Sequence, residues 1–488
     1  MVYFKKVKFF SLLFLCSCVS MSKEEQTENI IALPNLQPSF KESLDTGFFA
    51  LGDWPSKNWW EMFNSSQLES LIQEALQGNP DLQSVGSRIH AAEEAAKVVR
   101  SKLFPLVYFN AEDTWQLLSH HGLYRALNPD VDINATLIDL TLSFNYEFDF
   151  WGKNRNLYRA ALGEARARAA EWADVQLITT TSVAIGFFAL KTNLVRLRLY
   201  EALYHIRLGV FELQNHLRKH ALFSVLTPLF TEESVLEAEK LLHAIKEEVQ
   251  VNKHLINILM GKSPDNVLEV DDDLPLLPET LTIPETLSLD FLARRPDLMA
   301  QIWKVESIAD EVGAAKADFY PNINLGAFLG LESVFYSMLF NSQSKTMGLE
   351  PALHLPIFTA GAIKANVRAK KALFDEEVYR YNGLILRSVK EVADLLVLAE
   401  SLFKQKQDQV RIVETAAKRL RVTALREKSG LDSQFAKYAV EEELIEKQLE
   451  DVALLYGQYL ASIKLVKALG GGYLSEYVLP LKNEGARE

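Results

Sequence analysis

The sequence contains an internal repeat, and this repeat constrains the fold more than any other feature. Asn-Pro-Asp-Leu at 79–82 matches Arg-Pro-Asp-Leu at 295–298, which lies 216 residues later. In each copy an amphipathic helical stretch follows, and a second proline, Pro105 or Pro321, stands 25 residues after the first. Two helices of equal length with equivalent stops predict two structurally equivalent halves.

Each helical stretch is followed by two segments in which apolar and polar residues alternate. The first half places them at about 105–118 and 134–150, and the second half at about 320–332 and 347–358. A strict period of two predicts strands with one apolar and one wet face, long enough to cross a membrane when tilted. Four strands cannot close a barrel, so membrane-embedded strands would have to be pooled between protomers. A soluble one-sided sheet is the alternative.

The strands lead into long proline-free segments, at 154–220 and 363–428, whose residues predict helices. At about 1.5 Å per residue, each helix would reach on the order of 100 Å. Each is expected to turn at a short loop and to return, over 232–260 and 435–469. The uncharged run 175–190 is short and contains three threonines, so it predicts a packed bundle segment rather than a membrane span.

The N-terminus has the pattern of an export signal. Three lysines precede a short apolar run that ends at Leu15, and Cys16 and Cys18 are the only cysteines of the chain. Leu15 stands at −3 and Ser17 at −1 from Cys18, which resembles the bacterial lipobox and makes Cys18 the candidate lipid attachment site. An ordinary signal peptide with an incidental cysteine is the alternative. Without disulfides, the fold must be stabilised by packing.

Composition and motifs exclude several function classes. The formal charge is −12, with 52 basic and 64 acidic residues, so nucleic acid is not an expected partner. The chain contains no H-E-x-x-H, P-loop or G-x-S-x-G motif, which argues against an enzyme and against a cofactor. His120 and His121 are adjacent in a predicted loop without further ligands, so no metal site is expected.

These patterns divide the chain into six parts. The expected boundaries are a lipoprotein signal peptide at 1–17, a tether at 18–56, a first repeat at 57–262 with its hairpin at about 153–262, a crossover linker at 263–290, a second repeat at 291–473 with its hairpin at about 361–470, and a loose tail at 474–488. The linker assignment rests on four prolines and the run Asp271–Asp273.

The ordered set of motifs resembles one family over about residues 45–473. That family is the TolC-type outer-membrane factors, in their lipidated branch related to nodulation protein T and OprM. The resemblance lies in Trp59-Trp60 with Phe63, the spacing of leucines from Leu68 to Leu82, Phe104-Pro105, Phe148 to Gly152, Arg295-Pro296-Asp297, Tyr320-Pro321 and Pro356-Ile357-Phe358 with Gly361.

The resemblance implies an α+β membrane protein of the cell outer membrane that extends into the periplasm. Three chains would form a homotrimer, with a twelve-stranded transmembrane β-barrel made of four strands from each chain and continued by a long α-helical coiled-coil tunnel. It also implies passive export of drugs or other small compounds, with a periplasmic adaptor protein and an inner-membrane transporter as partners. Asp139, Glu147 and Asp149 are expected to face water inside the barrel.

Asp432, at the tip of the second hairpin, is the candidate channel constriction. Three copies near a trimer axis would narrow the tunnel and attract cations, whereas a single Asp432 could instead cap the returning helix. The first tip, 224–228, departs from the family because it lacks glycine and contains Pro228. Two other functions stay open: a type I protein-secretion channel of the same fold, and a non-conducting lipidated coiled-coil scaffold.

Overall fold

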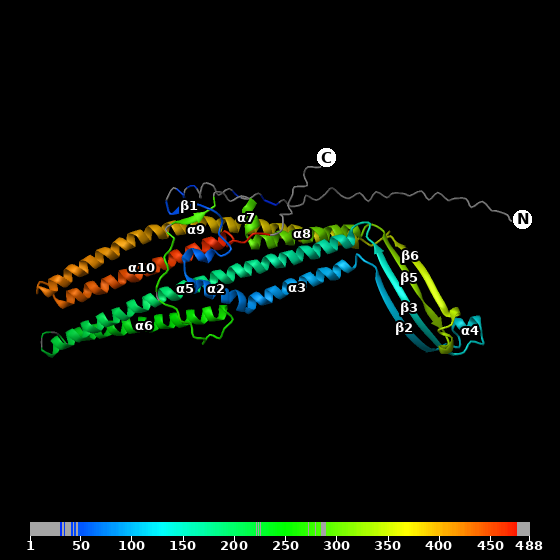
Figure 1. Cartoon of the computed structure of the whole chain (residues 1–488), viewed down its shortest axis with the longest axis horizontal. Helices are drawn as coiled ribbons and strands as arrows, with labels where there is room; N and C mark the ends of the chain where they lie inside the picture. The colour runs from blue at the N-terminus through cyan, green and yellow to red at the C-terminus, as the bar shows by residue number, and fades with distance from the viewer. Residues whose placement is uncertain are drawn as a thin grey trace.

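The structure is a computed structural model that combines long helices with a small sheet at one end (Figure 1). It describes residues 30–475, apart from 32–33, 35–40, 42, 45–46, 221, 223, 225, 272, 279 and 285–288. The signal peptide, Cys18 and most of the expected tail lie outside the described residues.

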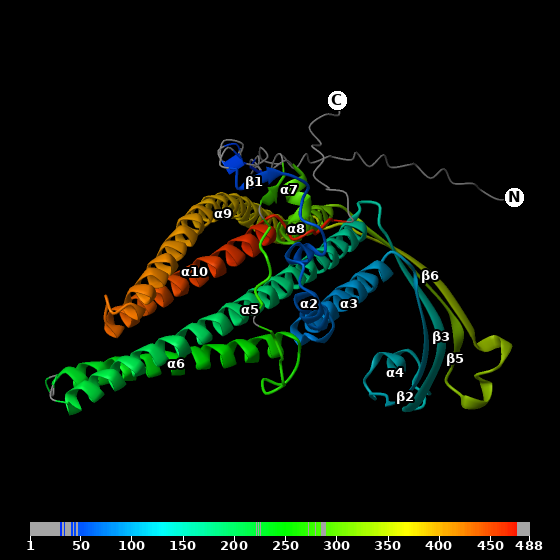
Figure 2. The same ribbon diagram turned by 60° about the vertical axis from the view of Figure 1, so that its left-hand side comes forward.

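Each half of the chain contributes one long helical hairpin. The first consists of α5 (Lys153–Lys219) and α6 (Leu226–Leu259), and the second of α9 (Ala362–Lys428) and α10 (Gln434–Ala468). Both α5 and α9 have 67 residues, so each is about 100 Å long. The hairpins extend away from the sheet, and α10 packs against both α9 and α5 (Figures 1 and 2).

The first hairpin turns earlier than the sequence suggests. We expected the returning helix to begin at Glu232, but α6 begins at Leu226, which puts Pro228 in its first turn. A proline is tolerated there because a first-turn N–H has no partner within the helix.

The repeated tetrapeptides start two equivalent helices, α3 (Pro80–Ser101) and α8 (Pro296–Ala317). α2 (Ser66–Gly78) precedes α3, and the short α7 (Leu289–Arg294) precedes α8. The proline at the first position of each helix has a φ suited to a helix and no N–H to satisfy. α3 packs on α5, and α8 packs on both α5 and α9. The two repeats are thus joined along the shared helix α5.

The sheet has four antiparallel strands in the order β2-β3-β5-β6. Their bounds are β2 (Leu106–Leu117), β3 (Asn134–Phe148), β5 (Asn322–Ser333) and β6 (Lys345–His354). β6 was expected at about 347–358 but begins at 345 and ends at 354, and as an edge strand it accommodates Pro351 within its length. β3 and β5 pair directly, so the sheet joins the two repeats.

Two short strands change the interpretation of the tether and the linker. β1 (Phe49–Leu51) lies within the expected tether, and β4 (Leu281–Ile283) lies within the expected linker, yet they pair in parallel. Phe49, Leu281 and Ile283 are buried in the core against α8 and α9. Three-residue strands are too short to produce a periodic signal, so only the tertiary structure identifies them as packed parts of the domain.

The crossover segment is also fixed by polar contacts. The Lys191 side chain of α5 is buried, its ammonium contacts the Asp271 carboxylate, and it donates to the Asp273 carbonyl over 2.8 Å. The Tyr459 hydroxyl of α10 contacts the Pro275 carbonyl. Because α5 and α10 belong to different hairpins, the crossover segment ties the two repeats together.

A second core lies beneath the 3₁₀-helix η1 (Trp59–Phe63). Trp59, Trp60 and Phe63 pack with Phe188 of α5 and Tyr459 of α10. Among the described residues, α5 alone is long and apolar enough to span a membrane, but 56% of its most apolar window is buried inside the chain. Its apolar residues therefore serve as bundle core, in agreement with the expectation for 175–190.

Candidate functional site: the open sheet and the hairpin tips

Strand register sorts the sheet into two chemically different faces. One cross-strand row is Phe109, Leu142, Leu329 and Met347, and the next row is Asn110, Thr141, Gly330 and Thr346. Residues directly opposite each other share a face, and neighbours along a strand alternate between faces. The first row is entirely apolar and the second entirely small or polar, so the alternation expected from the sequence extends coherently across both repeats.

Most of the apolar face is uncovered within the described chain, although Ile138, near one end of β3, is buried. Phe109 is 68% exposed, Leu349 69% and Met347 71%. Soluble monomers rarely expose contiguous apolar surface of this kind, and such a face indicates contact with lipid or with another chain. The outer edges of β2 and β6 also pair with no strand among the described residues.

The opposite face carries acidic residues at one level. Glu112, Asp139 and Glu332 lie directly opposite one another on β2, β3 and β5. Glu147 lies at the other end of β3, where it accepts a hydrogen bond from Asn322 over 3.0 Å. Like charges at opposing positions are destabilising unless water solvates them, so this face is suited to a water-filled space.

Asp149 has a different role from the one expected. It lies beyond the end of β3, and its carboxylate accepts hydrogen bonds from the backbone N–H of Asn154 at 3.1 Å and of Arg155 at 2.9 Å. These are unpaired donors of the first turn of α5, where negative charge is also favoured by the helix dipole. Asp149 therefore fixes the junction between sheet and helix instead of continuing the wet face of the strand.

Aromatic residues mark this junction. The rings of Trp151 and Tyr320 are stacked, with centroids 4.7 Å apart and planes 16° apart. The Trp151 indole N–H also donates to the Pro321 carbonyl over 2.8 Å. Both repeats thus contribute to one aromatic cluster at the end of the sheet, a position typical of membrane–water interfaces.

At the opposite end of the molecule, Asp432 is paired within its own chain. Its carboxylate accepts two hydrogen bonds from the Arg426 guanidinium, at 2.7 and 3.1 Å. This hydrogen bonding lowers the pKa of Asp432 and raises that of Arg426. The returning helix α10 is capped by Ser433, whose hydroxyl accepts from the Ala436 N–H. Asp432 is therefore not the cap of this helix, and that alternative is wrong.

Arg426 was missed at the sequence level. It lies six residues before Asp432, a separation outside the i, i+3 and i, i+4 pairs of a helix, and the two meet only because the chain reverses at Gly430. The glycine with φ of +73° marks the turn, but the pairing depends on the geometry of the turn itself.

The first tip is more apolar than the second. Leu222, Leu226, Leu229 and Phe230 are all exposed there, the last by 71%. His120 and His121, the adjacent pair not expected to bind a metal, lie in a turn before α4 (Leu123–Leu127), at the other end of the molecule. The two ends of the molecule therefore differ in surface. One end consists of helix tips with mixed polar and apolar residues, and the other consists of a sheet with one apolar and one polar face.

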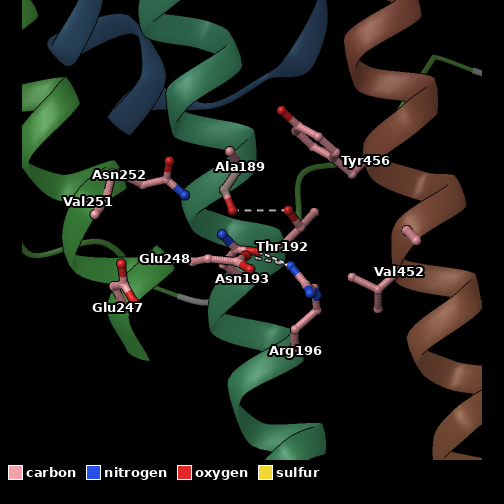
Figure 3. A pocket seen from close by; sticks show the side chains of 11 residues that line it. Ala189, Thr192, Asn193, Arg196, Glu247, Glu248, Val251, Asn252, Val452 and Tyr456 are labelled. Carbon is pink, nitrogen blue, oxygen red and sulfur yellow. Dashed lines mark hydrogen bonds and ion pairs between the residues drawn. The ribbon is translucent and has the colours of Figure 1, made fainter. Parts of the chain in front are cut away.

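The bundle between these ends contains grooves. One groove of about 470 Å³ lies between α5, α6 and α10 (Figure 3). In it Arg196 reaches Glu248 at 2.8 Å and Asn193 at 2.7 Å, so its charge is locally compensated.

Comparisons with known proteins agree with this geometry. The family described as outer membrane efflux protein matches residues 71–259 and 287–471. The chain belongs to this family. The multidrug resistance outer membrane protein MdtQ of Escherichia coli O6:H1 is 30% identical over 474 residues, which cover 95% of this chain and 96% of that protein. MdtP of the same strain is 28% identical over 454 residues, covering 92% and 93%.

Solved structures show the same fold. The outer-membrane channel OprN has a TM-score of 0.80 at 21% identity, covering 92% of this chain and 98% of its own. The outer membrane protein VceC of Vibrio cholerae has a TM-score of 0.76 at 29% identity, covering 86% and 100%. This efflux protein is therefore an outer-membrane channel component with a helical tunnel segment and a strand segment, and it acts in export.

Proposed function

We propose that three copies of this efflux protein form one conduit, with a twelve-stranded barrel in the outer membrane and a helical tunnel in the periplasm. The observation that carries this proposal is the open, two-faced sheet. Unpaired backbone at the outer edges of β2 and β6 is prohibitive in lipid, where no water replaces the missing partner. Pooling the strands of three chains removes every edge and turns the apolar face outward.

The conduit is passive and has no enzymatic activity of its own. The named relatives are multidrug resistance proteins, which supports drugs or other small compounds as the exported substrates. The exposed hairpin tips support docking of a periplasmic adaptor protein that connects the channel to an inner-membrane transporter. A type I protein-secretion channel is the second candidate, because it would use the same fold with a different cargo.

A pair of neighbouring residues on β3 tests the orientation of the sheet. Leu142 lies on the apolar face and Thr141 on the polar face. A lysine on the lipid face near the middle of the membrane costs about 2–4 kcal/mol, whereas a lysine inside the barrel remains hydrated. Leu142→Lys should reduce the amount of assembled protein in outer-membrane fractions, and Thr141→Lys should not. Equal tolerance of both lysines would contradict the barrel orientation.

Deletion of the gene separates the cargo alternatives. If the protein acts in efflux, the deletion strain should be more sensitive to drugs. The wild-type gene should restore resistance, and the Leu142→Lys variant should not. Loss of a secreted protein without any change in drug sensitivity would favour the type I secretion channel. A non-conducting scaffold predicts neither change, and also predicts that purified protein opens no channels in planar bilayers.

Cys18 anchors the mature chain to the membrane in this proposal, through the lipobox formed by Leu15 and Ser17. Cys18→Ser should abolish incorporation of labelled palmitate, while Cys16→Ser should leave it unchanged. Labelling that persists without Cys18 would remove the assignment.

Asp432 contributes to the periplasmic constriction in this proposal. The salt bridge to Arg426 means that a ring of three tips would carry alternating charges instead of three bare carboxylates. In such a ring the Arg426 guanidinium would hold each Asp432 carboxylate in a fixed position. The ion selectivity of the channel would then depend on both residues.

A further inference from the structure

A second groove on the helical wall differs from the first in charge. It has a volume of about 550 Å³ and lies between α5, α9 and α10. Its basic residues come from the second hairpin, and the first hairpin adds two hydroxyl groups. The polar lining relevant here is Arg387, Lys390, Lys464, Lys467, Thr181 and Ser182.

The positive charges of this groove exceed the negative ones. Of its two carboxylates, Asp394 pairs with Lys390, and Glu391 pairs with Arg295, which lies outside the lining. Within the described residues, Arg387, Lys464 and Lys467 form no ion pair at all; Asp174 acts on Lys467 only from longer range. Three cationic groups therefore converge on one groove, in a chain whose formal charge is −12.

The floor of the groove is apolar. Leu395 of α9 and Ile463 of α10 are buried, and Ile185 of α5 completes the floor. A ligand that fits this arrangement carries an anionic group for the basic rim and an apolar body for the floor. Charge-assisted hydrogen bonds and buried apolar area would then both contribute to its binding.

Helix periodicity places both grooves on one face of the wall. Ser182, Ile185, Ala189, Asn193 and Arg196 follow one another along α5 at steps of three or four residues and line the two grooves. With 100° per residue, this stripe is roughly opposite to the buried stripe that contains Ala184 and Phe187.

That buried stripe lies against the core beneath η1. One side of a tunnel wall is directed toward the tunnel axis. The side of α5 that carries the grooves can be directed there, because the opposite side is packed beneath η1. The step from groove to tunnel interior rests on the proposed function.

We propose that this basic groove is a binding site for amphiphilic organic anions, which this channel retains on the wall of its tunnel during export. In an otherwise acidic protein, an isolated cationic groove concentrates anions locally. The neighbouring groove of Figure 3 has no such excess, because Arg196 is paired with Glu248.

Because the two grooves differ in their unpaired positive charge, the same kind of substitution can be compared in both. The full-length protein in lipid nanodiscs is titrated with fluorescein, an aromatic dianion, and binding is followed by fluorescence anisotropy. Removal of one charge-assisted hydrogen bond corresponds to about a tenfold change in Kd. We expect Lys464→Gln to weaken binding about tenfold and Arg387→Gln with Lys464→Gln about a hundredfold. Arg196→Gln removes one positive charge from the neighbouring groove and should leave the Kd unchanged.

Several results would overturn the site: wild-type affinity in the double variant, equal weakening by Arg196→Gln, or equally tight binding of the cationic dye rhodamine 6G. Thermal unfolding of each variant checks that the substitution leaves the fold intact. Single-channel recording separates this proposal from the proposed function. A conducting protein without fluorescein binding refutes the groove alone, and binding by a protein that does not conduct refutes the channel but retains the groove.

Discussion

Asn79 and Arg295 stand at equivalent positions of the two repeats and perform the same task with different chemistry. The Asn79 amide donates to the Leu259 carbonyl, and the Arg295 guanidinium donates to the Ala468 carbonyl, so each ties the start of its helix to the end of the returning helix. Arg295 also pairs with Asp297 at 2.8 Å and with Glu391 at 3.1 Å. Gly261 and Gly470 complete these junctions, because each packs against the backbone carbonyl of the residue before the helix cap.

Gly470 gives a residue-level prediction about stability. Its φ is +95°, and a Cβ there would lie 1.9 Å from the Arg294 carbonyl oxygen, so Gly470→Ala forces the backbone apart. We expect a loss of more than about 3 kcal/mol in unfolding free energy. Gly430 has a φ of +73°, but a Cβ there would meet no atom within 4 Å, so Gly430→Ala should cost only about 1–2 kcal/mol. Thermal unfolding of the two purified variants checks the difference, and similar losses would contradict the packing argument.

The pairing of Asp432 with Arg426 predicts opposite effects on ion selectivity. Asp432→Asn leaves Arg426 uncompensated at the tip, so the channel should become less cation-selective and less sensitive to block by divalent cations. Arg426→Gln leaves the carboxylate uncompensated and should shift both properties the other way. Reversal potentials in a salt gradient measure the two shifts. Shifts of the same sign in both variants would show that the pair does not act at the constriction.

At the scale of elements, the contact between α5 and α8 contains carboxylates that resist ionisation. Burial and the nearby Asp310 raise the pKa of Glu306 to about 7, against the opposing effect of Arg166. Burial and Asp297 raise the pKa of Asp174 to about 6, although Lys467 and Arg295 act in the opposite direction. The folded protein therefore retains protons that the unfolded chain releases above pH of about 4–5.

The sign of this linkage predicts how stability depends on pH. Because the folded state binds more protons between the unfolded and folded pKa values, these groups destabilise the fold as pH rises from about 4 to about 7, and acidification reverses the loss. Glu306→Gln should raise the unfolding temperature at pH 8 by about 1–3 °C and have little effect at pH 4, below the ordinary pKa of the side chain. Thermal unfolding at both pH values, compared with wild type, isolates the contribution of Glu306. A variant whose shift is the same at pH 4 and pH 8 would contradict the raised pKa.

At the scale of the whole molecule, the sheet at one end and the hairpin tips at the other define a long channel component (Figures 1 and 2). The proposed trimer predicts a mass of about three times 55.2 kDa for the complex extracted in mild detergent, less the proposed signal peptide of each chain. Light scattering combined with refractive index and absorbance separates protein mass from detergent mass. A monomer that conducts in planar bilayers would refute the pooled barrel.

The repeat, the four strands, the long helices and the family could be predicted from the sequence, because periodicity and motif spacing are local properties that extend over many residues. The sequence could not identify β1 and β4, since three residues carry no period and the two strands lie far apart along the chain. Likewise, the roles of Asp149, Arg426 and the basic groove depend on chain reversals and on helices from different repeats meeting in space. Only the tertiary structure decides such contacts, because electrostatic and hydrogen-bonding partners are selected by distance in the fold and not by distance along the chain.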